Sequence, residues 1–166
     1  MGLSTTTLLA ESAAGLHWTA PAGWTAGPPQ MMRAATYAVA PARGDAAGAE
    51  CALYFFGAGQ GGSVEANIAR WTSQFTGPDG KPAKAAISTP TFHAVRMTTI
   101  DVAGDYTGMG GPLAAASKAV PDYRLLGAVV EGPGGNVFVK FTGPANTVAA
   151  NKAKFDLLLA SFAKDK

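Results

Sequence analysis

The amino-acid sequence predicts a single α+β domain in which antiparallel strands form a sheet and two helices pack against it. The chain has 166 residues, the length of one ordinary domain. Its strand-like segments come in hairpin-like groups joined by connections rich in Gly and Pro, and they do not alternate regularly with helices. Apolar residues recur at helical spacing in two windows, one near the middle of the chain and one at its C-terminal end.

The expected strands are bounded by Pro and Gly, which interrupt a sheet and favour turns. Residues 1–14 are small and polar, so we predict a flexible lead-in before a single domain that spans 15–166. The last two strands are predicted to form a hairpin across Gly132–Gly135. Extended segments are expected at 15–20, 31–39, 50–56, 86–106, 123–131 and 136–141.

The clearest helix follows the glycine-rich segment 57–62. Ser63 is of the residue type preferred at an N-cap, and Glu65 lies in the first turn, where the helix dipole favours a carboxylate. Gly77 and Pro78 end the helix. Its apolar stripe, which we expect to face a core, consists of Val64, Ile68, Trp71 and Phe75.

A second helix is predicted to close the chain, from Ala145 to about Phe162. Pro144 occupies its first position, where the missing N–H of proline costs nothing. Its core face is formed by Phe155, Leu158, Leu159 and Phe162. Before the last hairpin, residues 108–122 are rich in Gly and Pro and predict a mobile loop with a short helical turn at 113–118.

The composition excludes several classes of function. Thirteen Lys and Arg are scattered against 11 Asp and Glu, so the basic patch that nucleic acid requires is missing. No apolar run approaches the roughly 18 residues of a membrane-spanning helix. Cys51 is the only cysteine and lies in an apolar run, which favours a buried, inert thiol. His17 and His93 have no neighbours at metal-ligand spacing, and no catalytic motif occurs, so we predict no metal, no cofactor and no catalytic residue.

Two features are candidate binding sites. Asn67, Arg70 and Gln74 form a polar stripe on the first helix, and this stripe is a solvated surface, a homodimer contact or a functional surface. The glycine loop 57–62 follows a strand and opens a helix, as phosphate-binding loops do. A dinucleotide fold is disfavoured because no acidic residue ends a following strand about 20 residues later. The loop is then a flexible connection, or a site for a small anion or peptide carboxylate beside Gln60.

Three stretches of the sequence resemble the PsbP/Mog/DcrB superfamily, namely Trp18–Trp24, Tyr54–Phe75 and Phe138–Phe162. The resemblance covers residues 15–163 and implies an antiparallel sheet flanked by helices, in an α/β/α sandwich. Within it, the stretch 59–75 resembles an uncharacterised bacterial branch whose members are often exported or lipid-anchored.

The resemblance implies binding rather than catalysis. Relatives dock onto photosystem subunits or a small GTPase, or act in the bacterial envelope without a known reaction, so we expect a non-enzymatic binding or accessory domain with a protein partner. The implied location is the periplasm, or another place outside the cytoplasm, after removal of a signal. A lipid anchor on the full-length precursor is compatible with this, and a cytoplasmic protein is the alternative.

The surface that the resemblance points to is the block Gln60, Asn67, Arg70 and Gln74, together with Arg33 from the neighbouring strand. The alternative function is a small-molecule or anion binder, with a hydrolase as one case, that uses the glycine loop 57–62.

Overall fold

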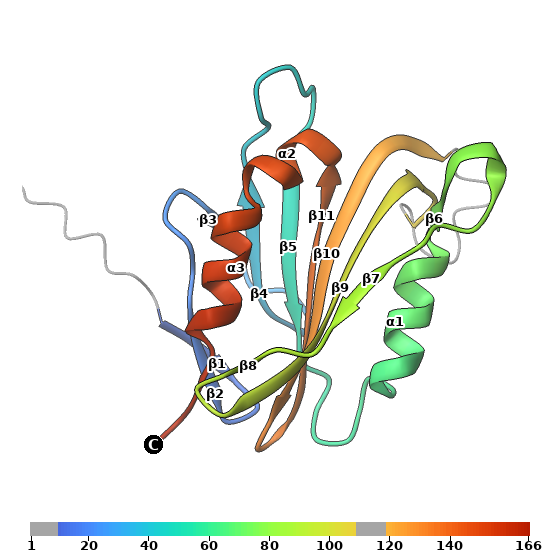
Figure 1. Cartoon of the computed structure of the whole chain (residues 1–166). Coiled ribbons are helices and arrows are strands. Elements are labelled where there is room, and N and C mark those ends of the chain that lie inside the picture. The colour runs from blue at the N-terminus through green and yellow to red at the C-terminus, as the bar shows by residue number, and fades with distance from the viewer. Residues whose placement is uncertain (1–9, 109–118) are drawn as a thin grey trace, which may run out of the picture.

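The computed structural model describes residues 10–108 and 119–166. Within these residues the chain forms a large antiparallel sheet, a small antiparallel sheet and helices that pack on them (Figure 1). A mostly antiparallel sheet with a few helices confirms the predicted α+β fold. The predicted loop over 108–122 lies largely outside the described residues, and its helical turn at 113–118 lies entirely outside them.

Three long strands form the centre of the large sheet. They are β9 (Val95–Tyr106), β10 (Val120–Gly132) and β11 (Gly135–Pro144), and the last two form the predicted hairpin. The sheet continues on the β11 side through β5 (Ala49–Tyr54), β4 (Arg33–Val39) and β3 (Thr25–Ala26). On the other side, β9 pairs with β6 (Phe75–Thr76), β7 (Ala86–Ser88) and β8 (Thr91–Phe92).

The remaining elements pack around this sheet. The small sheet consists of β1 (Ala10–Ala13), β2 (Leu16–Thr19) and β12 (Ala163–Lys164). The helices are α1 (Val64–Ser73), α2 (Ala145–Ala150) and α3 (Lys152–Ser161), and a 3-10 turn lies at Pro78–Gly80.

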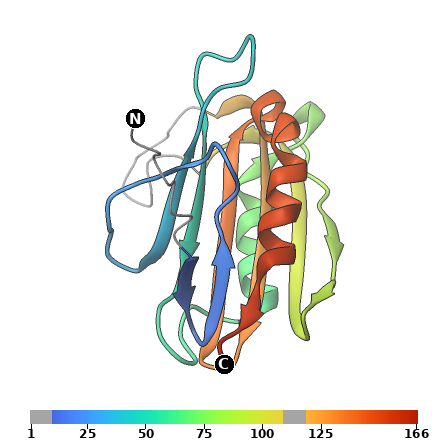
Figure 2. The ribbon, with the colours of Figure 1, turned by 90° about the vertical axis from the view of Figure 1, so that its left-hand side faces the viewer.

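Hydrophobic cores lie on both faces of the large sheet. Because successive residues of a strand point to opposite faces, β10 contributes Leu126 to one core and Leu125 to the other. The first core contains Phe155 of α3, and the second contains Trp71 of α1. The two helices therefore lie on opposite faces of the sheet (Figure 2).

Several elements differ from the sequence-based expectations. Residues 10–13, expected in the flexible lead-in, form β1 and pair with β2. The extended segment 86–106 is divided into three strands, and β10 begins at Val120 rather than at residue 123. Phe75 is buried as predicted, but it lies in β6, beyond the end of α1.

The closing helix is also broken, at Asn151, into α2 and α3. The Asn151 side chain explains the break: its amide nitrogen donates to the Thr147 carbonyl at 2.9 Å, and its oxygen accepts from Trp24 Nε1 at 3.2 Å. These hydrogen bonds hold the Asn151 backbone at φ −111°, outside the helical range. In the described parts of the chain, no helix is long and apolar enough to cross a membrane.

Candidate functional site

Helix α1 is positioned by its own N-cap and by its apolar face. The Ser63 hydroxyl accepts a hydrogen bond from the Ala66 amide at 3.0 Å, which confirms the predicted cap. Ile68 and Trp71 are buried against the sheet. This orientation turns the predicted polar stripe of Asn67, Arg70 and Gln74 toward β5 and β11.

Asn67 is an anchor for the glycine loop rather than an exposed contact residue. Its side chain is buried, and its amide nitrogen donates to the Gly61 carbonyl at 2.9 Å and to the Ser63 carbonyl at 2.8 Å. Its side-chain oxygen accepts from the Arg70 guanidinium. The expectation of an exposed stripe is therefore wrong for Asn67, which joins loop 57–62 to α1.

The glycine loop contains one internal backbone hydrogen bond, and the helix that follows it is capped by its own side chain. The Gln60 amide donates to the Gly57 carbonyl at 3.1 Å, and the first-turn amide of Ala66 is taken by Ser63. Gln60 itself is exposed and does not line the cavity described next.

A cavity of about 190 Å³ lies between α1 and strands β5 and β11. We call its lining the aromatic–cationic patch: Tyr54, Phe56, Asn67, Arg70, Trp71, Gln74, Phe138 and Lys140. The patch brings together three of the five residues that the sequence predicted.

Lys140 lies on β11 at the position that pairs with Ala52 of β5 and Gly127 of β10, and this register directs its side chain to the α1 face. Its ammonium donates to Gln74 Oε1 at 3.0 Å and to the Tyr106 hydroxyl at 3.1 Å. Burial, together with the positive charges of Arg70 and Arg33, lowers the pKa of Lys140 to about 8.

Arg33 borders the patch from β4. Its guanidinium lies over the Tyr54 ring, 5.2 Å from the centroid, and donates to Glu50 Oε1 at 2.9 Å and to Thr36 Oγ1 at 3.3 Å. Arg33 therefore stiffens one wall of the patch, and its charge is compensated by Glu50.

The aromatic side chains form a connected wall. Tyr54 stacks on Phe56 with ring centroids 5.8 Å apart, and Phe56 contacts Phe138 at 5.7 Å. Phe56 is 37% exposed, which is unusual for a phenylalanine in such a cluster. Tyr106 lies behind Lys140, and burial raises the pKa of Tyr106 to about 12, so it stays a neutral hydroxyl beside the ammonium.

Sequence reasoning missed Tyr54, Phe56, Phe138 and Lys140 as site residues. They lie in runs such as Phe138-Val139-Lys140-Phe141, which read as ordinary buried strands. The available signal was Lys140 itself, a charged residue in the middle of an apolar strand.

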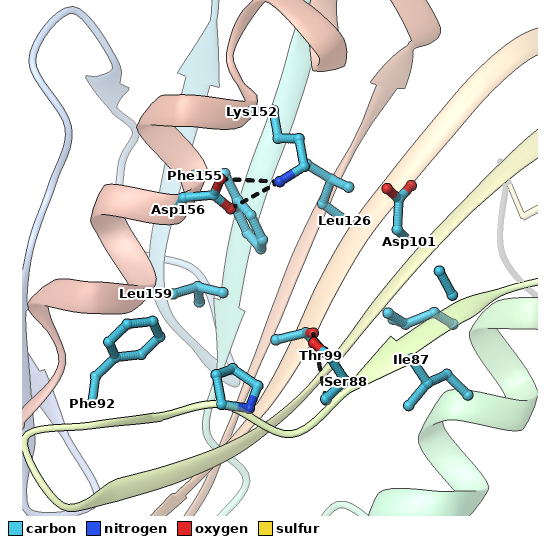
Figure 3. Close-up of a pocket in the computed structure, with 13 residues that line it drawn as sticks. Ile87, Ser88, Phe92, Thr99, Asp101, Leu126, Lys152, Phe155, Asp156 and Leu159 are labelled. Carbon is cyan, nitrogen blue, oxygen red and sulfur yellow. Dashed lines mark hydrogen bonds and ion pairs between the residues drawn. The ribbon is translucent and has the colours of Figure 1, made fainter.

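A second cavity, of about 310 Å³, lies between α3 and the β7–β9 region (Figure 3). Its floor is apolar and includes Leu126, Phe155 and Leu159. Its charged groups are already neutralised, because Lys152 pairs with Asp156 at 3.0 Å and Asp101 receives two hydrogen bonds from the Arg124 guanidinium. The charged groups of this cavity therefore leave no net charge for an ionic ligand to neutralise. A wider groove of about 1030 Å³ between α1 and the segment that leads into β7 is mainly apolar.

The described residues contain no cluster of His, Cys, Asp and Glu that could hold a metal ion. Cys51 is fully buried as predicted, and burial raises the pKa of its thiol far above the ordinary range.

No protein-family model matches this chain, and no curated protein matches it. Among solved structures, the solution structure of cyanobacterial PsbP (CyanoP) from Synechocystis sp. PCC 6803 is similar, with a TM-score of 0.54 and 11% sequence identity. The similarity covers 99% of this chain and 98% of that chain. At this identity the similarity shows the fold alone, so the chain has a PsbP-like fold.

Proposed function

We propose that this chain is a non-enzymatic binding domain that captures a partner protein through the aromatic–cationic patch. The observation that carries the proposal is the combination of a partly exposed aromatic wall with two cations, Arg70 and Lys140, around one cavity. Aromatic and Arg side chains are enriched where protein interfaces gain most of their binding energy.

The uneven cover of the sheet supports the same proposal. On the α1 face, the second core extends from α1 across β9 and β10 to Phe138 of β11. Farther along the same face, Ala38 of β4 and Glu50 of β5 are exposed. The patch lies at this border, where a partner would contact both the aromatic wall and the neighbouring strands.

We further propose that the fold is an α/β/α sandwich and that the protein is located in the cell envelope. Helices on opposite faces of an antiparallel sheet support an α/β/α sandwich of the PsbP type. The sequence resemblance to a bacterial branch of that superfamily supports a location in the cell envelope. Fractionation of the source cells tests the location, and recovery in the cytoplasmic fraction would contradict it.

Site-specific photocrosslinking tests the docking proposal. A photoreactive amino acid replaces Phe56 in the full chain, and a matched control replaces Leu157, which is 67% exposed on α3 across the sheet. We expect a covalent product with one protein from position 56 and none from position 157. Excess unlabelled wild-type chain should suppress the product. The same products from both positions, or no product from position 56, would contradict the proposal.

A further inference from the structure

We infer that the group accepted by the aromatic–cationic patch is the carboxylate of an acidic side chain on the partner protein, held between the Arg70 guanidinium and the Lys140 ammonium. This inference rests on the proposed function and names the chemistry of the partner. The partner segment would carry an apolar side chain beside the acid, in contact with the exposed edge of Phe56.

The charge balance of the patch is the first argument. Arg33 is paired with Glu50, but the described hydrogen-bond partners of Arg70 and Lys140 are neutral side chains. Among residues 10–108 and 119–166, no carboxylate lies within ion-pair distance of either cation. Segments 1–9 and 109–118 contain no Asp or Glu in their sequence. No acidic side chain of those two segments can therefore neutralise the site.

Unused donors are the second argument. An ammonium carries three N–H donors, and Lys140 directs two hydrogen bonds to Gln74 and Tyr106. A guanidinium carries five N–H donors, and the Arg70 side chain donates one described hydrogen bond, to Asn67. Asn67 and Gln74 thus hold the two cations in place while leaving donors for an anion.

The size and walls of the cavity select a carboxylate. A volume of about 190 Å³ fits the end of one acidic side chain, and a planar carboxylate matches the fork of a guanidinium. The two cations stand among aromatic rings rather than in a basic stripe, so the patch does not suit a polyanion. A free small acid would fill the cavity but leave the exposed edge of Phe56 uncovered, which favours an acid on a protein surface.

Blocked peptides test the inference on the isotope-labelled full chain by NMR. The first probe is acetyl-Ala-Phe-Glu-Leu-Ala-amide, the second has Gln in place of Glu, and the third is the Gln peptide with a free C-terminal carboxylate. We expect the Glu peptide to shift the signals of Phe56, Arg70 and Gln74 and to bind about tenfold more tightly than the blocked Gln peptide, since hydrogen bonds to charged groups are stronger.

Three variants make the test specific. Arg70→Ala and Lys140→Met should each reduce binding of the Glu peptide to the level of the Gln peptide. Lys152→Ala removes one positive charge from α3, across the sheet, and should leave binding unchanged. Two variants on the site keep the test decisive if one of them is poorly folded.

Four results would overturn the inference: equal binding of the Glu and blocked Gln peptides, no shifts at millimolar peptide, equal losses in Lys152→Ala and the site variants, or tightest binding of the free C-terminal carboxylate. The photocrosslink at Phe56 separates this failure from failure of the proposed function. If that product persists undiminished in Lys140→Met, docking stands and the carboxylate inference fails. If the Glu peptide binds selectively but no protein crosslinks, docking of a protein partner fails.

Discussion

Asn67 shows how one buried amide can organise the edge of a binding site. It bonds the Gly61 carbonyl of the glycine loop, the Ser63 carbonyl at the N-cap of α1 and one guanidinium, so it couples the loop, α1 and the patch. A buried polar group of this kind contributes mostly through the cost of leaving its partners unsatisfied.

Replacing Asn67 by Ala is therefore expected to lower the free energy of unfolding by about 1–3 kcal/mol, because the Gly61 carbonyl and Arg70 lose a partner. Urea denaturation measures the change. Asn146→Ala, at an exposed position of α2, is the control and should stay within about 0.5 kcal/mol of wild type. A loss for Asn67→Ala no larger than that of the control would show that the amide is not a structural anchor.

Lys140 should make stability depend on pH in the alkaline range. Burial and the charges of Arg70 and Arg33 lower its pKa in the folded state from 10.5 to about 8, against the weaker opposing effect of Glu50, while Tyr106 faces it as a neutral hydroxyl. The unfolded chain then binds the proton more tightly than the folded chain. The cost to folding is complete below pH 8 and is relieved as the pH rises from about 8 toward 10.5.

Urea unfolding of wild type and Lys140→Met between pH 7 and 10 measures this effect. The wild type should gain stability relative to the variant across this range, because only the wild type carries the ammonium that loses its proton. Lys152→Met is the matched control, since Lys152 is exposed on α3. Parallel pH profiles for wild type and Lys140→Met would contradict the lowered pKa.

At the scale of elements, the glycine loop is shaped by the aromatic wall behind it. Gly61 has φ +95°, and a Cβ atom there would lie 2.5 Å from Phe138 Cε2 and 2.7 Å from Phe56 Cδ2. Gly59 also has a positive φ, of +70°, but a Cβ atom there meets nothing within 4 Å. Substitutions at Gly59 and Gly61 therefore separate the free-energy cost of backbone strain, which both share, from the cost of steric crowding, which only Gly61 has.

Gly61→Ala is expected to lower the free energy of unfolding by about 2–4 kcal/mol, because backbone strain and overpacking add. Gly59→Ala should lose only about 1 kcal/mol through strain. Thermal or urea denaturation of both variants makes the comparison. Equal losses would mean that the loop does not press against Phe56 and Phe138.

The sequence predicted elements well where one local signal decided them, and less well where distant contacts decided them. Ser63 followed by Glu65 and an apolar stripe identified α1 and its cap, and Gly132–Gly135 identified the last hairpin. The break at Asn151 depends on Trp24, which is 127 residues away, so no local pattern reveals it.

The same contrast between local signals and distant contacts explains why only part of the candidate site was predicted. Arg70 and Gln74 follow from the period of one helix. Lys140 and Phe56 join them only through the register of β5 and β11. Strand pairing is not visible in the alternation of one segment, so the aromatic half of the patch had to come from the structure.

At the scale of the whole molecule, both cores share the same strands. β9, β10 and β11 contribute side chains to the α3 side and to the α1 side. Loss of either core would therefore remove support from the strands on which the other depends. We expect the large sheet and the helices on both of its faces to unfold as one cooperative unit.

Hydrogen exchange with increasing urea tests this cooperativity. Slowly exchanging amides of α1 and α3 should converge on the same free energy of opening, because global unfolding exposes both. Amides of β10 serve as the internal reference. Convergence of α1 at a clearly lower free energy than α3 and β10 would instead identify the α1 side as a separately unfolding unit.

β9 is the last long strand on its side of the sheet, and its outer edge affects how copies of this chain interact at high concentration. With a net charge of only +2, the chain has little electrostatic repulsion to keep its copies apart. A long free strand edge would then be a template for aggregation. The outer edge of the 12-residue β9 is instead divided among β6, β7 and β8, each two or three residues long, with Pro90 between the last two. A neighbouring molecule therefore finds no continuous row of free backbone groups on β9 with which to extend the sheet.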